Sequence, residues 1–154
     1  MRKGFAKHRD VLFAHNATVG PVAILRTDED AIVLGTSLTY YRCDESHILP
    51  EYLAHYMRSH AFVRQYELVM RQSTRNQVPI TKQRTFDFLI PPIEKQRRMA
   101  GSLDDLADAI NAVERIAARK TALLAELKQS ILHKAFTGEL TSDSKGASRA
   151  LVAS

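Results

Sequence analysis

The chain has 154 residues, of which 45% are hydrophobic and 25% charged, proportions that are typical of a globular protein. This length fits one domain with an additional arm. The formal net charge is +5, and no apolar run approaches the roughly 18 residues of a membrane span. Because we also find no apolar leader, we expect a cytoplasmic protein without a membrane partner. The single cysteine, Cys43, excludes an internal disulfide and fits a reducing compartment.

Residues 1–92 carry the pattern of a small α+β domain. Short runs of β-favouring residues separated by polar turns predict strands at 11–14, 22–25, 31–34 and 36–42, and hence a mostly antiparallel sheet. Pro50 stands where the first residue of a helix is expected, and apolar residues at helical spacing continue to about Val69. Ser59 is a candidate cap for a second helix within this stretch. A polar loop is predicted at 73–81 and a last strand at 85–90.

The remainder is dominated by one long helical pattern, predicted over residues 93–140. Apolar residues recur at alternating spacings of four and three, which is the a/d pattern of a coiled coil. We call this series the seam. It contains Met99, Leu103, Leu106, Ile110, Val113, Ala117, Leu124, Leu127 and Ile131. Lys120 places one charge in the same register, and Gly138 stands where the helix is expected to end.

A helix of roughly 40 residues is about 60 Å long, because it rises ~1.5 Å per residue. We therefore predict a dimerisation arm or spacer, followed by a disordered tail at 141–154. The alternative is a core helix of a bundle, but the upstream sequence supplies no further helices of similar length.

The sequence predicts no metal, no cofactor and no catalytic site. The six histidines and Cys43 do not stand at ligand spacings. No glycine-rich phosphate loop is present. Two passages resemble the carboxylate-x-lysine ending of a nuclease site, Glu126-Leu127-Lys128 in the seam and Asp143-Ser144-Lys145 in the tail, and neither can converge with a partner acid.

Positive charge is concentrated between positions 64 and 84, where Glu67 is the one acidic residue. The basic residues of this segment are Arg64, Arg71, Arg75, Lys82 and Arg84. The polar loop within it contains Ser73, Thr74, Arg75, Asn76 and Gln77. Arginine pairs with guanine and Asn or Gln with adenine, while Ser and Thr hold phosphate oxygens. We therefore predict contacts to double-stranded DNA here, with a second surface at His15, Asn16, Thr39, Tyr41 and Arg42. The alternative is a solvated loop that caps the following strand.

Two passages of the chain resemble the specificity subunits of type I restriction-modification systems. The passage Pro91-Pro92-Ile93-Glu94-Lys95-Gln96-Arg97 leads into the long helix. Residues 128–140 match a closing motif Lys-x-x-Ile-Leu-x-x-Ala-Phe-x-Gly-Glu-Leu. Residues 9–12, 15–20 and 34–38 are similar to the later half of such a target-recognition domain, so the resemblance covers about residues 4–140.

This resemblance implies a non-catalytic subunit that reads DNA and directs methyltransferase and restriction subunits to a target site. Such a subunit has two recognition domains, each followed by a helix, and the helices pair antiparallel. This chain matches one partial recognition domain and one helix, so we expect a homodimer or a pairing with a related subunit. The alternative is a structural coiled-coil fragment that assembles with a larger specificity or methyltransferase subunit without contacting DNA.

Overall fold

The computed structural model describes residues 4–73 and 75–139 and shows the α+β fold that the sequence predicts. The chain divides between Asp105 and Leu106 into two compact units, which are named the globular unit and the helical unit below. The predicted tail at 141–154, the motif residue Leu140 and the loop residue Thr74 lie outside the described residues.

Two small antiparallel sheets form the strand layer of the globular unit. One has the order β3-β2-β5, and the other pairs β1 with β4. The strands are β1 (Phe5–Ala6), β2 (Val11–Ala14), β3 (Val22–Ile24), β4 (Ile32–Val33) and β5 (Leu38–Tyr41). The four predicted strands are thus confirmed, β2 with the predicted bounds and the other three with shorter ones. The additional strand β1 was not predicted, because its two residues lie within a basic stretch that is otherwise short of apolar residues.

Two helices cover one face of the three-stranded sheet, α1 (Pro50–Arg58) and α2 (His60–Arg71). Pro50 is the first residue of α1, as predicted. Ser59 separates the two helices with an extended backbone, and its hydroxyl donates to the Tyr56 carbonyl oxygen over 2.7 Å. The predicted break is therefore confirmed, but the predicted side-chain cap is wrong because the hydroxyl bonds back to α1.

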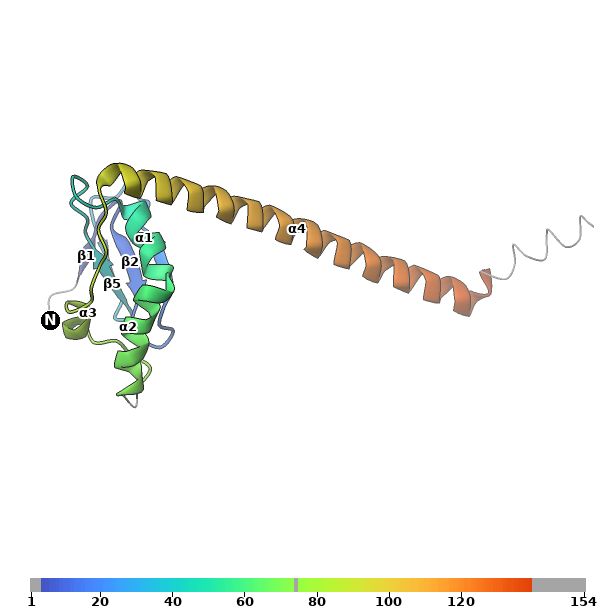
Figure 1. Ribbon diagram of the computed structural model, residues 1–154. Helices are drawn as coiled ribbons and strands as arrows, with labels where there is room; N and C mark the ends of the chain where they lie inside the picture. The colour runs from blue at the N-terminus through green and yellow to red at the C-terminus, as the bar shows by residue number, and fades with distance from the viewer. Residues whose placement is uncertain (1–3, 74, 140–154) are drawn as a thin grey trace, which may run out of the picture. The chain divides into compact units, whose positions relative to one another are not determined.

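The core lies between this sheet and α1 and α2 (Figure 1). Alternation in β2 buries Val11 and Phe13, while the intervening Leu12 is only half-buried. The Phe13 ring meets Phe62 of α2 edge-on, with 5.8 Å between the ring centres. Edge-to-face aromatic pairs of this kind add packing energy beyond their buried area.

The predicted strand at 85–90 is wrong, and the short helix α3 (Ile80–Gln83) begins within the last residues of the predicted loop. The residues at 85–90 pack Phe86 and Phe88 against the core, which explains their strand-like alternation. Their backbone pairs with helix side chains instead of a strand. Gln65 of α2 accepts from the Asp87 amide over 2.7 Å and donates to the Asp87 carbonyl over 2.9 Å.

The long helix α4 (Ile93–Thr137) begins as part of the globular unit. Gln96 is fully buried in its first turns. The Gln96 side chain donates to the carbonyls of His47 and Pro91 over 2.8 and 2.7 Å and accepts from the Leu49 amide over 2.9 Å. One side chain therefore fixes the start of α4 to the segment that precedes α1.

Candidate nucleic-acid interface

The predicted polar loop meets the chain just after the end of β2. Asn16 forms an isolated antiparallel bridge with Gln77. On one side of this bridge the Val78 amide donates to the His15 carbonyl over 2.8 Å, and on the other the Ala17 amide donates to the Asn76 carbonyl over 3.1 Å. Two segments that were predicted separately are therefore joined into one surface.

His15 itself serves the interior of this junction. His15 is buried, with 4% of its surface exposed. Its ring Nδ1 lies 3.1 Å from the Val78 carbonyl oxygen, so this nitrogen must carry the hydrogen. The imidazole therefore holds the loop in place and does not face an outside ligand.

Gln83 of α3 joins the second candidate surface to the same junction. Its side-chain Oε1 accepts from the Thr39 hydroxyl over 2.8 Å and from the Tyr41 hydroxyl over 3.1 Å. Its Nε2 donates to the Val78 carbonyl over 2.9 Å. Burial also raises the pKa of Tyr41, so this hydroxyl remains a protonated donor. Thr39 and Tyr41 thus support the loop from within, through a glutamine that sequence reasoning missed.

Arg42 is held on the other side of β5 by a buried carboxylate. Its Nε and Nη2 donate to the two oxygens of Asp10 over 2.9 and 2.7 Å, and Asp10 is 2% exposed. The guanidinium carbon also lies 5.0 Å from the centre of the Tyr40 ring. The hydrogen bond to Asp10 raises the pKa of Arg42 further. Arg42 therefore stays charged, but the edge of its guanidinium that could bind a ligand in a bidentate manner is already bound to Asp10.

The remaining candidates of the basic segment are turned to solvent. Arg64 and Arg71 share a face of α2 with Glu67 and Leu68, and the last of these is 60% exposed. The exposed candidates on α2, the loop and α3 are Arg64, Arg71, Ser73, Arg75, Asn76 and Lys82. Gln77 is half-buried. Among the described residues, the charged groups of the four basic members form no ion pair. These charges are therefore available to an outside anion.

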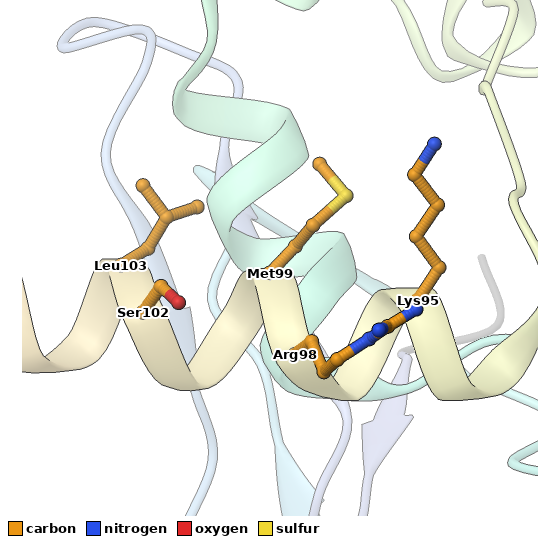
Figure 2. Close-up of a pocket in the computed structure, with 5 residues that line it drawn as sticks. All are labelled: Lys95, Arg98, Met99, Ser102 and Leu103. Carbon is orange, nitrogen blue, oxygen red and sulfur yellow. The ribbon is translucent and has the colours of Figure 1, made fainter.

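The seam is also exposed. In the globular unit, Met99 and Leu103 extend from the same side of α4 beside Lys95 (Figure 2), and each is 40% exposed. In the helical unit, the apolar seam residues from Leu106 to Ile131 are exposed, and the large ones reach 66% at Leu124. Ile116 and Leu123 are similarly exposed and widen the apolar stripe beyond the predicted a/d positions. The helical unit therefore presents a continuous apolar face that residues 4–73 and 75–139 leave exposed.

Two further features can be stated for residues 4–73 and 75–139. No three His, Cys, Asp or Glu side chains lie close enough together to hold a metal ion. None of the helices in these segments has the length and apolar character needed to cross a bilayer.

Comparisons with known proteins agree on one family. The family described as the type I restriction modification DNA specificity domain matches residues 4–120. A curated protein of Methanocaldococcus jannaschii, named as the MjaX specificity subunit of a type I restriction enzyme, is 26% identical over 88% of this chain. The match covers 33% of that relative.

Two solved structures are also similar to this chain. One, from a study of complex assembly and conformational transition of the type I R-M system, has a TM-score of 0.73 at 27% identity and covers 88% of this chain. The HsdS subunit from Thermoanaerobacter tengcongensis has a TM-score of 0.63 at 25% identity over 75% of this chain. The chain spans about a third of the length of these proteins, with 32% and 30% of them covered.

Proposed function

Because the chain belongs to the type I restriction modification DNA specificity family, we propose that it reads double-stranded DNA without catalysing a reaction and directs methyltransferase and restriction subunits to a target site. The observation that carries this proposal is the junction of residues 15–17 with residues 75–78, beside basic groups that have no described ion-pair partner. A protein that reads DNA needs charges for phosphates and a rigid set of polar groups for base edges, and this surface combines both.

The exposed side chains divide by position into two roles in this proposal. Arg75 and Gln77 lie in the loop beside Asn16, where polar groups from two segments meet, and we assign them to base edges. Arg64, Arg71 and Lys82 lie on helices and we assign them to phosphates. His15, Thr39 and Tyr41 support the loop through their internal hydrogen bonds.

Assembly of the proposed complex depends on the seam. A second copy or a related subunit covers it by antiparallel pairing of the helices. When two copies of the helix are aligned antiparallel about Arg115, Lys120 of one copy lies opposite Ile110 of the other. Glu114 or Asp108 then offsets the charge of Lys120. The exposed seam also favours a second candidate function, in which the chain only assembles with a larger specificity or methyltransferase subunit and does not contact DNA.

A competition assay with the assembled methyltransferase complex tests DNA reading. A target duplex is first selected from a random pool, and affinity is then compared on target and random duplexes. Arg75→Ala is expected to cost about 1–3 kcal/mol on the target and little on random DNA. Arg64→Ala is expected to weaken both alike and to reduce the slope of log affinity against log salt by about 0.9, the effect of losing one phosphate contact.

The matched control is Arg26→Ala, an exposed arginine outside both candidate surfaces. It should leave affinity and salt slope unchanged. Equal losses on both duplexes for Arg75→Ala would move this residue to the phosphate-binding class. An assembled complex that is indifferent to both Arg75→Ala and Arg64→Ala would favour the assembly-only function.

A further inference from the structure

The backbone of Ala17 adopts an unusual conformation at the tip that follows β2. Its φ is 63°, in the left-handed region that residues with a Cβ atom rarely adopt. Alanine has no polar side chain that could stabilise this conformation locally. The surrounding structure must therefore hold the tip, which consists of Asn16, Ala17 and Thr18.

Asn76 binds both backbone polar groups of Ala17. Its side-chain Nδ2 donates to the Ala17 carbonyl oxygen, and its backbone carbonyl accepts from the Ala17 amide over 3.1 Å. The Ala17 amide also lies 3.0 Å from Oδ1 of Asn16. The left-handed residue is thus held mainly by one asparagine that is distant in sequence.

The other end of the same turn is also fixed. Gly20 has a φ of 119°, and its amide donates to the Ala14 carbonyl over 3.0 Å. A Cβ atom added at Gly20 would come 3.0 Å from the Tyr66 hydroxyl oxygen of α2. The turn therefore has one end packed on α2 and the other end bound to Asn76, while Ala17 and Thr18 themselves are exposed.

We propose that Asn76 is a positioning residue, which holds the tip of Asn16, Ala17 and Thr18 against the loop at 75–77 so that both face DNA as one recognition surface. This inference rests on the proposed function. It also revises the prediction that Asn76 reads a base. The Asn76 amide nitrogen has two N–H groups, and the Ala17 carbonyl binds one of them, which holds the amide against the tip. We therefore assign this side chain to positioning instead of to adenine reading.

The test combines Asn76→Ala with Ala17→Gly. Glycine adopts positive φ without steric cost, so it removes the need for an external hold on the tip. Asn76→Ala should reduce the ratio of target to random affinity by about fivefold, the equivalent of one hydrogen bond of average strength. Ala17→Gly in the same chain should restore most of this ratio. Direct base reading by Asn76 predicts instead no restoration and a loss of preference at a single base pair, which would overturn the inference.

A second measurement is made without DNA, by hydrogen exchange of the Ala17 amide in the free chain. Asn76→Ala should accelerate this exchange by about fivefold, again the equivalent of one average hydrogen bond. Asn111→Ala, an exposed asparagine of α4, should leave both the exchange and the affinity ratio unchanged. Unchanged exchange in Asn76→Ala would overturn the inference.

The two measurements separate the failure of this inference from the failure of the proposed function. If Arg75→Ala reduces target affinity but Asn76→Ala does not, the chain reads DNA and Asn76 does not position the reading surface. If neither substitution changes target affinity, the proposed function itself fails, and with it the inference, even when exchange at Ala17 is accelerated.

Discussion

The globular unit and the helical unit differ in how much of their own surface they cover. In the globular unit, Phe13, Met57 and Phe62 are fully buried. Over the parts of the chain that the structure describes, each buried side-chain nitrogen or oxygen has a hydrogen-bond partner. From Leu106 to Glu139, by contrast, Ala112 is half-buried and the other described residues are exposed, leucines included.

This difference indicates what each unit requires to be stable. In the globular unit, the apolar core is buried and the buried polar side chains have hydrogen-bond partners. The helical unit satisfies its backbone through helical hydrogen bonds but leaves its apolar side chains in water. Covering apolar surface contributes about 25 cal/mol per Å², so the helical unit gains stability only when a second surface covers the seam.

The largest expected effect comes from placing charge in the seam. We expect the wild-type chain to have about twice its 17.3 kDa mass in light scattering at micromolar concentration. Leu106→Lys combined with Leu124→Lys should reduce this to the mass of one chain, because two buried and unpaired ammonium groups would face the partner. The globular unit should stay folded, which its far-ultraviolet circular dichroism and amide exchange will report.

The matched control places two lysines elsewhere on the same helix. Ala118→Lys with Ala125→Lys uses exposed positions outside the a/d register and should leave the dimer intact. A wild-type mass of 17.3 kDa at this concentration would contradict self-association and leave a different subunit as the partner.

A smaller effect is expected where α4 joins the globular unit. In Gln96→Leu the leucine side chain has a volume similar to that of glutamine, but it leaves two carbonyls and one amide without their buried hydrogen-bond partner. We expect a loss of about 3 kcal/mol in the free energy of unfolding, from the cost of unsatisfied buried groups. Denaturant unfolding at fixed protein concentration measures this, since association raises apparent stability. Lys95→Leu, at the exposed neighbouring position, should change little; an equal loss there would point to helix propensity instead of the buried amide.

Sequence reasoning succeeded where periodicity alone decides the structure. The long helix, the strand at 11–14 and the start of α1 at Pro50 follow from local patterns that tertiary contacts reinforce. The predictions failed where a distant side chain decides. The residues at 85–90 alternate like a strand because Phe86 and Phe88 face the core, yet their backbone pairs with Gln65.

The candidate site shows the same division. Composition identified the basic segment and its polar loop, and the basic side chains of this segment are exposed. Composition could not separate side chains that face solvent from those whose polar groups are occupied inside, because His15 and Thr39 look like any surface polar residue. Gln83 was missed for the converse reason. Its three hydrogen bonds depend on where α3 packs, and no local pattern marks it.

The smallest expected effect concerns the segment that replaces the predicted strand. Gln65→Ala removes both hydrogen bonds to the Asp87 backbone, which remains partly accessible to water. Because water replaces the lost partners, we expect a loss of about 1–2 kcal/mol in the free energy of unfolding, below that of Gln96→Leu. Gln65→Glu should lose about half of this, since its carboxylate still accepts from the Asp87 amide but cannot donate to the carbonyl.

Denaturant unfolding and amide exchange at Asp87 measure both Gln65 variants. Gln72→Ala is the matched control, an exposed glutamine at the end of α2 whose side chain has no hydrogen bond in the described structure. If residues 85–90 were instead paired with a strand in solution, the Asp87 amide would stay protected in Gln65→Ala, because a backbone ladder does not depend on that side chain. Faster exchange at Asp87, with the exchange of β2 unchanged, would establish that a helix side chain takes the place of the missing strand partner.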